Sequence, residues 1–241
     1  MRSGKSKRKK WRPCELEDQS WFPDILRDYQ TIFLATLDRV LGLYQPLDSL
    51  LNKIDPPPKK IVDLASGSGE SAVRSTGRLR AEGTELLLTD KFPVKIGKYH
   101  SIYLKSPLDA SASELPRANL YTMFNAFHHF GPGQRLDIAL KATKNGGRFL
   151  AIEPLRPRVS VFLKVFISTL IGPILLAPFM RPFSPWWLVF TYMLPLGILA
   201  TWWDGMASVF RSLNQAEWEE LENELKRENR SVEQGLIPTT M

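Results

Sequence analysis

The sequence is poor in cysteine, because only Cys14 is present among 241 residues. A single thiol excludes a disulfide within the chain and a metal cluster made of several cysteines. A reducing compartment is therefore the simpler expectation. The three histidines form no recognisable metal-binding pattern with other residues, so we predict no metal site.

Acidic residues are absent from the first twelve positions, which carry seven lysines and arginines. The formal charge of the chain is +7, so the remainder is formally neutral. We expect residues 1–16 to form a basic, disordered tail that is solvated or rests on anionic lipid. The neutral remainder disfavours nucleic acid as a partner. The tail also lacks the long apolar core of a secretory signal, so we do not expect export.

A helical region is predicted over residues 17–55. Apolar residues recur at helical spacing over 24–44, and a second short helix is predicted over 47–54. Three consecutive prolines at 56–58 close this region, because proline interrupts a helix.

Beyond the prolines, short β-branched runs alternate with helical stretches. We predict strands at 60–64, 85–89, 101–104, 118–124 and 147–153, with a possible last strand at 231–237. The helices are predicted at 70–81, 93–98, 132–144 and 215–230. This alternation indicates an α/β fold with a doubly wound, mostly parallel sheet.

The stretch IVDLASGSGE, residues 61–70, is a strand that runs into a glycine-rich turn. It lacks the G-x-G-x-x-G spacing with which dinucleotide-binding folds approach a pyrophosphate. Instead, Asp63 precedes Gly67 and Gly69, and Glu70 follows them. Two carboxylates repel a pyrophosphate but attract a ligand that carries an amino group and a sulfonium. The turn therefore favours a cationic ligand over a phosphate.

Two further acids follow predicted strand ends. Asp90 ends LLLTD, 21 residues past Gly69, where a parallel sheet presents a carboxylate to ribose hydroxyls. Asp109 and Ala110 follow the next predicted strand, in SPLDASASELP. Because the carboxyl ends of parallel strands share one edge, we expect Asp63, Asp90 and Asp109 to face a common site.

These stretches resemble the class I S-adenosylmethionine-dependent methyltransferases. DLASGSGE is similar to their motif I, and FNAFHHF, residues 124–130, is similar to the N-x-x-H-H stretch beside the cofactor's methyl group. With DQSWFPDILRDYQTIFL, LTDKFP, TYMLPLGILATWWDG and ASVFRSLNQAEWEEL, the likeness covers about Asp18 to Leu225. It points to a poorly characterised family with an apolar insertion after the fifth strand. The sequence departs from it at Ala65, where some relatives carry cysteine, and in a shortened terminal hairpin.

The resemblance implies a Rossmann-like domain over 56–158 that binds S-adenosylmethionine and is completed by residues 204–241. In this family the acid after the second strand holds the ribose, and an acid with a backbone amide after the third holds the adenine. The implied cofactor-binding residues are Asp63, Ala65, Ser66, Gly67, Gly69, Asp90, Asp109, Ala110 and Asn125.

His128 and His129 are the candidate catalytic residues, because histidine can accept a proton from a methyl acceptor near neutral pH. The alternative is a hydrogen-bonded histidine packed under a loop. Neighbouring residues at a strand exit point to opposite sides, so we expect at most one to face the substrate. Asn125 and Glu153 have two readings as well, as polar groups beside the cofactor or as strand-end caps.

Residues 159–203 form an apolar insertion in which Lys164 and Arg181 are the only charged residues, and Asp204 and Gly205 are expected to start the helix that follows. Both ends return to the sheet, so three geometries are open: a hairpin through the bilayer, a re-entrant or surface-lying hairpin, or a soluble lid. The apolar wall implies a hydrophobic or lipid-like acceptor. Together with the basic tail, it predicts membrane association on the cytoplasmic side.

The expected function is S-adenosylmethionine-dependent methyl transfer to a hydrophobic small molecule at a membrane surface. One alternative is a non-catalytic, membrane-associated module that retains the fold. The other is an RNA methyltransferase guided by the basic tail, which predicts binding that falls steeply with salt.

Overall fold

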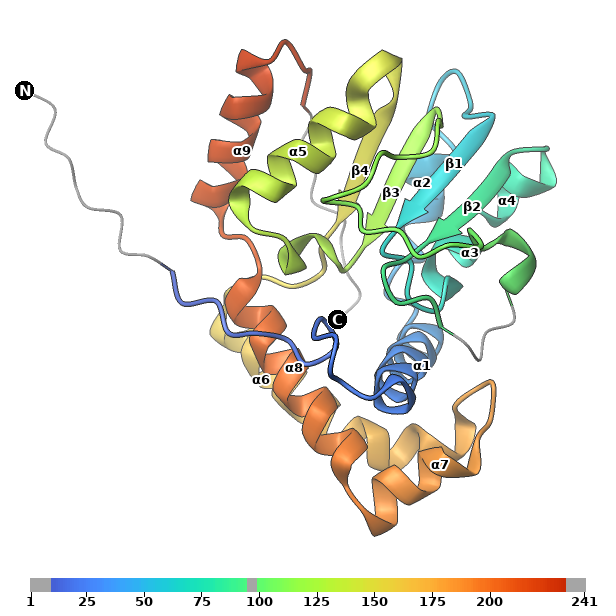
Figure 1. Cartoon of the computed structure of the whole chain (residues 1–241), viewed down its shortest axis with the longest axis vertical. Coiled ribbons are helices and arrows are strands. Elements are labelled where there is room, and N and C mark those ends of the chain that lie inside the picture. Colours follow the sequence, from blue (N-terminus) through green and yellow to red (C-terminus); the bar gives the residue numbers. More distant parts are fainter. Residues whose placement is uncertain (1–9, 95–98, 233–241) are drawn as a thin grey trace, which may run out of the picture.

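The computed structural model describes residues 10–94 and 99–232. Figure 1 shows a four-stranded parallel sheet surrounded by helices, so the chain is an α/β protein. The strands are β1 (Lys60–Leu64), β2 (Glu85–Thr89), β3 (Leu120–Phe124) and β4 (Arg148–Ile152). Their order is β2-β1-β3-β4, so the chain crosses from one side of β1 to the other between β2 and β3. Open parallel sheets bind ligands at such a switch, outside the carboxyl ends of the strands.

The strands divide their side chains between two apolar clusters on opposite sides of the sheet. Ile61 and Leu120 belong to the cluster that includes α2, α3 and α4, whereas Val62 and Tyr121 pack with α5 and α9. Alternation along each strand produces this division, and burial on both sides explains why the strands read as apolar runs. The bounds of these helices are α2 Leu47–Leu51, α3 Glu70–Ser75, α4 Gly77–Ala81, α5 Pro132–Thr143 and α9 Gln215–Arg227.

A separate group of helices lies beyond the carboxyl edge of the sheet (Figure 1). Tyr29 in α1 meets Trp187 in α7 with ring centroids 5.8 Å apart, and the Tyr29 hydroxyl lies 2.7 Å from Thr191 Oγ1. The helices α6 and α8 lie side by side, and a Cβ on Gly205 would come within 2.7 Å of Thr169 Cγ2. The members of this group are α1 (Asp24–Leu41), α6 (Val159–Leu176), α7 (Pro185–Leu188) and α8 (Leu196–Arg211), with short 3-10 and π turns at Ala177–Phe179 and Val189–Met193.

Most predicted elements are confirmed. The first helix ends at Leu41 because Gly42 takes the left-handed conformation, and the N–H of Gly42 bonds the carbonyl of Asp38 at 2.7 Å. The second helix is also shorter than predicted and ends at Leu51. Four predicted strands are present, two with unchanged bounds and two shortened: 60–64, 85–89, 118–124 and 147–153. The predicted helices at 132–144 and 215–230 are α5 and α9.

The strand predicted at 101–104 is wrong. A 3-10 turn occupies His100–Ile102, and Tyr103 makes a single bridge to Leu88 in β2. The side chain of Tyr103 explains the departure, because its hydroxyl donates to the carbonyl of Gly67. This contact holds the residue at the glycine turn instead of in a longer ladder along β2.

The helix predicted at 70–81 is divided into α3 and α4 at Thr76, whose φ and ψ are −104° and 7°. The Thr76 hydroxyl donates to the carbonyl of Ala72 at 2.7 Å, and Gly77 follows. Threonine that bonds the preceding turn bends a helix, and glycine is a weak helix former. These two residues together account for the break.

The structure differs from the predicted disordered tail over residues 10–16. Lys10 and Arg12 pair with Glu217 in α9 at 2.6 and 2.9 Å, and the side chain of Glu15 is fully buried. Residues 1–9 lie outside the described residues. The basic residues therefore attach this segment to an acidic site on α9, which composition alone does not reveal.

The predicted end of the apolar insertion at residue 203 is not a structural boundary, because α8 continues to Arg211. Asp204, expected to begin a new helix, lies within α8, and its Oδ1 accepts the N–H of Leu16 at 2.6 Å. Ser231 and Val232 are not in a strand. Two predicted elements fall largely outside the described residues: the helix at 93–98 and the last strand at 231–237.

Candidate functional site

The turn after β1 adopts a backbone that glycine permits best. Gly67 and Gly69 have φ values of 53° and 74°, and Ala65 also has a positive φ of 51°. A Cβ on Gly69 would lie 2.3 Å from Leu88 Cδ1, so a larger residue would have to displace the buried side chain of Leu88 in β2. The glycines therefore allow the turn to pass close against the end of the neighbouring strand.

Ser66 fastens this turn to both strands. Its hydroxyl donates to the carbonyl of Asp63 at 2.9 Å and accepts the N–H of Thr89 at 3.1 Å. The backbone N–H of Ser66 also bonds the carbonyl of Thr89 at 2.9 Å. The ends of β1 and β2 are thus held together before any ligand contributes.

Asp90 lies directly after β2 and holds the turn from the other side. Its Oδ2 accepts the N–H of Gly67 and its Oδ1 accepts the N–H of Phe92, each at 2.8 Å. Burial raises the pKa of Asp90, and these two backbone N–H groups oppose the rise. Each carboxylate oxygen keeps a lone pair for a further donor. The residue predicted to bind ribose therefore also acts as a strand-end cap.

Asp63 is a buried acid without a cationic partner. Its side chain is 1% exposed, and Oδ1 accepts the Thr122 hydroxyl at 2.6 Å. Burial raises its pKa to about 7, and the charge of Asp90 adds to the rise. Over residues 10–94 and 99–232, no lysine, arginine or histidine forms an ion pair with it. A cationic ligand group would stabilise its charged form.

Asp109 and Ala110 follow the bridge at Tyr103. Asp109 Oδ1 accepts the backbone N–H and the hydroxyl of Ser111 at 3.0 and 2.7 Å, and Lys91 lies 3.1 Å from Oδ2. Partial burial of Asp109 favours its neutral form, but the bonds from Ser111 and Lys91 outweigh burial and lower its pKa. Ala110 is buried in the core. Asp109 is thus ionised and already partnered at neutral pH.

Asn125 stands at the end of β3 with a positive φ of 49°. Its backbone N–H bonds the carbonyl of Ile152 at 2.8 Å, whereas its buried Oδ1 has no hydrogen-bond partner. A buried acceptor of this kind is costly unless a ligand or water donates to it. This oxygen, unlike Asp63, therefore has no hydrogen-bond donor in the described chain.

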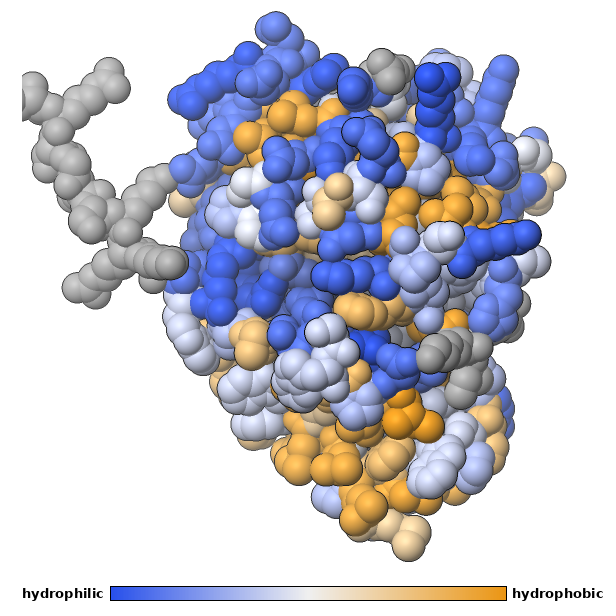
Figure 2. Space-filling view, viewed as in Figure 1, coloured by the Kyte–Doolittle hydropathy of each residue, from blue (hydrophilic) through white to orange (hydrophobic). Residues whose placement is uncertain are grey.

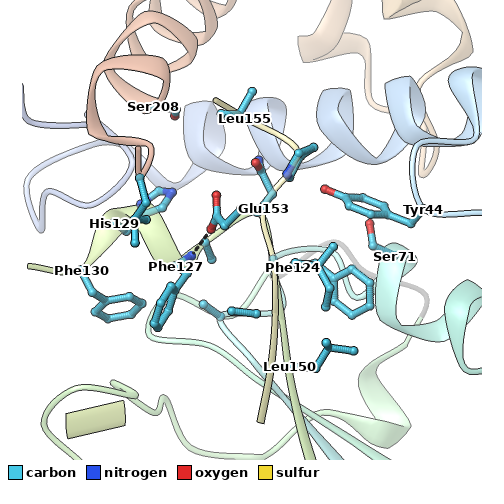
Figure 3. A pocket seen from close by; sticks show the side chains of 18 of the residues that line it. Tyr44, Ser71, Phe124, Phe127, His129, Phe130, Leu150, Glu153, Leu155 and Ser208 are labelled. Carbon is cyan, nitrogen blue, oxygen red and sulfur yellow. Dashed lines mark hydrogen bonds between the residues drawn. The ribbon is translucent and has the colours of Figure 1, made fainter. Parts of the chain in front are cut away.

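A cavity of about 2660 Å³ runs along this edge of the sheet. Figure 3 shows aromatic side chains, among them Tyr44, Phe124 and Phe127, beside the polar ends of the strands. The cavity extends to α6, where Lys164 and Val165 contribute to its wall. The predicted site residues that line it are Asp63, Ala65, Ser66, Gly67, Asp90, Asp109, Ala110, Asn125 and His129. Neither Gly69 nor His128 is among the described lining residues.

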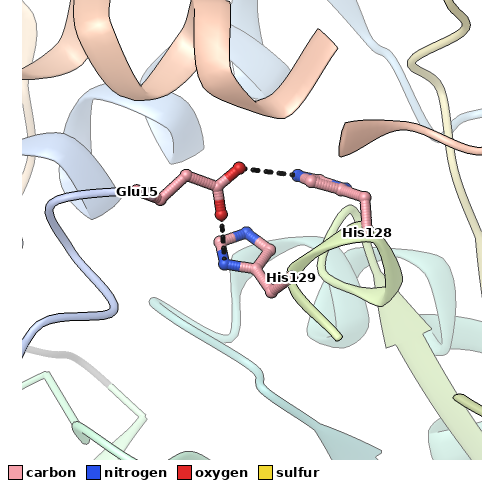
Figure 4. A group of neighbouring side chains, drawn as sticks. All are labelled: Glu15, His128 and His129. Carbon is pink, nitrogen blue, oxygen red and sulfur yellow. Dashed lines mark ion pairs between the residues drawn. The ribbon is translucent and has the colours of Figure 1, made fainter. Parts of the chain in front are cut away.

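The prediction that His128 and His129 point to opposite sides of a strand is wrong. Both lie in a 3-10 turn at Phe127–His129, with ring centroids 4.6 Å apart, and both face Glu15 (Figure 4). Glu15 Oε2 lies 2.7 Å from His129 Nδ1, and Glu15 Oε1 lies 3.7 Å from His128 Nε2. We call these three residues the Glu15–histidine cluster.

Glu153, at the end of β4, orients His128. Its Oε1 accepts the N–H groups of Phe127 and His128 at 2.6 and 3.2 Å, and its Oε2 lies 2.8 Å from His128 Nδ1. Because Glu153 accepts on both oxygens, His128 Nδ1 carries a proton. The side chain of His128 is fully buried, so only His129 is placed to meet a molecule in the cavity.

Further charged groups surround the cluster. Burial favours the neutral form of Glu15, but His129, His128 and Arg211 outweigh it and lower its pKa to about 2. Burial raises the pKa of Glu17 to about 8 and that of Asp204 to about 6. The charges of Glu15 and Asp18 outweigh the burial of His129 and hold its pKa well above the usual value. The N-terminal segment therefore places acids beside His128 and His129, where the sequence predicted histidines alone.

Glu15 is not predicted from the sequence as a site residue, because its partners are remote in the chain. Ser208, which donates to Glu15 Oε1 at 2.9 Å, is 193 positions away. The available signal was an abrupt change of charge, since Glu15, Glu17 and Asp18 directly follow the basic run. That change marks a segment boundary, but it does not identify the residues that the segment contacts.

Apolar side chains are exposed at the far end of the helical group, where Figure 2 shows them gathered near α7. Among helices within the described chain, Val159–Phe179 is long and apolar enough to cross a membrane, and most of its residues are not buried in the protein. Pro185–Met193 and Leu196–Arg211 are long and apolar enough to cross a membrane only when taken as one pair, and the two helices are bent by 81° relative to each other. We call the exposed end the apolar tip: Ile171, Ile174, Leu175, Phe179, Phe183, Trp186, Tyr192, Met193, Leu194, Leu196 and Leu199.

The carboxyl edge of the sheet thus brings together the glycine turn, three acids and Asn125, with the Glu15–histidine cluster beside them. In comparisons with known proteins, the chain matches no protein-family model and shows no significant similarity to any curated protein.

Proposed function

We propose that this chain is a class I S-adenosylmethionine-dependent methyltransferase with a doubly wound, Rossmann-like sheet. The cofactor would lie at the carboxyl ends of β1, β2 and β3, where the strand order reverses. The acceptor would be a hydrophobic small molecule reached from the apolar insertion.

The observation that carries the proposal is the buried carboxyl group of Asp63 beside the glycine turn. It is 1% exposed, lines the cavity and has no cationic partner among the described residues. A phosphate at this edge would meet the acids of Asp63 and Asp90, whereas an ammonium group would complete the missing ion pair. The electrostatics therefore favour an amino-acid-containing, positively charged ligand.

The other residues at this edge fit parts of the same cofactor. Asp90 keeps lone pairs that can accept ribose hydroxyls, because its two oxygens each hold one backbone N–H. Asp109 and Ala110 stand where the adenine would lie. Asn125 Oδ1 lacks a donor, which a polar group of the ligand would supply. These assignments follow the family resemblance residue by residue.

The bound cofactor would supply an activated methyl group on a sulfonium, so the protein chiefly needs to align the acceptor and exclude water. Aromatic side chains at Tyr44, Phe124 and Phe127 form the apolar part of the cavity. A general-base role for His129 stays a prediction. His128 is fully buried, so we assign it a structural role: it holds the turn Phe127–His129 in place.

Association with a membrane surface is the second part of the proposal. The apolar tip is exposed, and contiguous exposed apolar surface is typical of membrane or protein contact sites. The cavity reaches along α6 to Thr169, two residues before the tip begins at Ile171, so the tip and the cavity adjoin along this helix. Lys10 and Arg12 bind Glu217, which removes two basic residues from the tail that an RNA substrate would need.

Calorimetric titration with S-adenosylmethionine tests the cofactor assignment. We expect saturable binding of S-adenosylmethionine and S-adenosylhomocysteine, with NAD as the comparison ligand. Asp63→Asn should weaken binding by roughly 10- to 100-fold, because a hydrogen bond to a charged group contributes about 1.5–3 kcal/mol. Preference for NAD, or no binding by folded protein, would refute the assignment.

A non-catalytic scaffold is the alternative that one observation favours. Asp90 holds the turn through Gly67 and Phe92, which a protein without cofactor would also require. The scaffold reading predicts that Asp63→Asn changes no ligand affinity. Binding of the sulfonium compound without transfer to any extracted lipid would support a binding module instead of an enzyme.

A further inference from the structure

The Glu15–histidine cluster has the composition and size of a metal site. One ligand atom from each of Glu15, His128 and His129 lies within 4.8 Å of the other two. In a tetrahedral zinc site with bonds of roughly 2.0–2.1 Å, ligand atoms are about 3.3 Å apart. The distances of 2.7 and 3.7 Å from the Glu15 oxygens to the two imidazoles lie on either side of that value.

His128 supplies the independent observation that points to a ligand. Its Nδ1 donates to Glu153, so in the neutral imidazole Nε2 carries a lone pair. Nε2 is buried, has no hydrogen-bond partner and faces Glu15 Oε1 at 3.7 Å. Two acceptors that face each other across a gap of this size are stabilised by a proton or a metal ion between them. A carboxylate bonded to the remote nitrogen is also the usual support of a metal-bound histidine.

The protein's own cation nearby does not fill this role. Arg211 Nε lies 3.8 Å from Glu15 Oε1, and its guanidinium is directed mainly at backbone carbonyls. Nε bonds the carbonyl of His128 at 3.3 Å, Nη1 bonds that of Pro13 at 3.2 Å, and Nη2 bonds that of His129. Arg211 therefore organises the backbone around the cluster and leaves its carboxylate accessible to a second cation.

The surroundings favour a further positive charge. Asp18 Oδ1 lies 3.0 Å from His129 Nδ1, so this oxygen is in reach as the fourth ligand. Glu17 Oε1 lies 3.7 Å from His129 Nε2, and Asp204 binds the backbone of the same N-terminal segment. Four acids, Glu15, Glu17, Asp18 and Asp204, thus outnumber the two groups that carry positive charge here, Arg211 and the imidazole of His129. This excess is costly unless the acids are protonated or bind a further cation.

We propose that Glu15, His128 Nε2 and His129 Nδ1 bind a divalent transition-metal ion of the zinc class, with Asp18 as the fourth ligand. Two imidazoles with carboxylates select such an ion over magnesium or calcium, which prefer sites made of oxygens alone. The ion joins the N-terminal segment to the turn after β3. This inference stands apart from methyl transfer, since no cofactor-directed residue takes part.

Metal analysis of the full chain, purified without a histidine tag, tests the proposal. We expect one zinc ion per chain, a loss of zinc after chelation and its return on titration. Zinc at 100-fold above its dissociation constant should raise the melting temperature by about 5–10 °C, and magnesium should not. Cobalt substitution should give visible absorption bands of a four-coordinate nitrogen and oxygen site.

Variants separate this site from adventitious binding. Glu15→Gln and His129→Gln should each weaken zinc binding by at least about 10-fold, and Glu153→Gln, which acts through His128, by about 10- to 100-fold. His100→Gln is the matched control, because His100 is the third histidine of the chain and lies outside the cluster.

Two outcomes would overturn the proposal: wild-type protein that binds no zinc, and zinc binding that His100→Gln reduces as much as Glu15→Gln does. The cluster would then be an ion-pair network held by shared protons. If the cluster variants fail to fold, the metal content, chelator response and cobalt spectrum of the wild-type protein still decide the question.

Discussion

Two buried acids at the same edge of the sheet behave in opposite ways. Asp63 accepts the Thr122 hydroxyl and has no cationic partner in the described part of the chain, and burial raises its pKa to about 7. Glu15 is equally buried, yet His129, His128 and Arg211 overcome the effect of burial and lower its pKa to about 2. The difference teaches that burial alone does not reveal the function of an acid. The protein supplies cations to Glu15, whereas the described residues supply none to Asp63.

The strongest way to break this comparison is to remove the charge of Glu15. Glu15→Gln removes the fully buried carboxylate from His129 and Arg211, which keep only the partly exposed Asp18, so we expect the free energy of unfolding to fall by about 3–5 kcal/mol. Urea denaturation of chelator-treated protein at neutral pH measures it. Because the pKa of Glu15 is lowered, its stabilisation is present at neutral pH and is lost only as the pH falls toward 2.

The control for Glu15→Gln is Glu82→Gln. It removes an exposed carboxylate at the C-terminal end of α4 that pairs with Arg78 in the same helix at 3.1 Å. Exposed pairs of this kind contribute about 0.3–0.5 kcal/mol. Equal effects of the two substitutions would mean that Glu15 contributes no more than a surface pair, and the contrast with Asp63 would be lost.

The backbone beside Asp63 gives the next effect. Gly69→Ala forces a side chain into a positive φ and to within 2.3 Å of Leu88. Strain of about 1–2 kcal/mol and overpacking of about 1–3 kcal/mol should together lower the free energy of unfolding by roughly 3 kcal/mol. Gly83→Ala has a positive φ but no neighbour within 4 Å, so it reports the strain alone.

Denaturation curves for the two alanine variants check this prediction. Gly69→Ala should be the less stable of the two, and it should also bind S-adenosylmethionine more weakly because the turn moves. Equal stabilities would show that β2 yields without cost, and the turn would then impose no close approach.

The pH dependence of stability sharpens the comparison from the side of Asp63. A folded pKa near 7, above the unfolded value of 3.8, gives stabilisation that is present at low pH and lost as the pH rises through 7. Between pH 5 and pH 7 the ligand-free protein should lose roughly 2–3 kcal/mol relative to Asp63→Asn. Urea titrations of both proteins across this interval measure the difference.

Saturating S-adenosylmethionine should reduce this loss, because a bound ammonium group stabilises the charged form of Asp63. A ligand-independent slope would indicate that no cation reaches the carboxyl group. A slope that Asp63→Asn retains would assign the titration to another group, and the contrast with Glu15 would then rest on geometry alone.

The smallest expected effect on folding stability concerns the apolar tip, whose side chains are exposed. Met193→Ser with Leu194→Ser removes side chains that are 75% and 55% exposed. If the tip enters lipid, partition into anionic vesicles should fall by about 100-fold or more, since each of the two buried apolar side chains contributes roughly 1.5–3 kcal/mol. The melting temperature should stay unchanged.

Vesicle sedimentation at low and high salt measures this partition. Val40→Ser is the matched control, because Val40 is 63% exposed on α1, outside the tip. Wild-type protein that stays in solution with all vesicles would remove the membrane from the proposed function and leave the tip as a protein-contact or lid surface.

The sequence by itself determined the features that depend on neighbours along the chain. The alternation of apolar runs fixed the four strands, because a buried parallel strand needs little more than a short apolar segment. The spacing of Asp63, Gly67 and Gly69 fixed the turn, since the acid and both glycines lie within seven residues at the end of the strand. Asp90 was placed correctly for the same reason, because it directly ends β2.

Only the tertiary structure decided which groups meet across the chain. Glu15 reaches His128, His129 and Ser208 because the N-terminal segment crosses the end of α8, and composition predicted that segment to be disordered. The same packing turned Asp204 from an expected helix start into an acceptor for Leu16. Charges far apart in sequence acquire their pKa values and partners from the packing that buries them, and no local pattern records that burial.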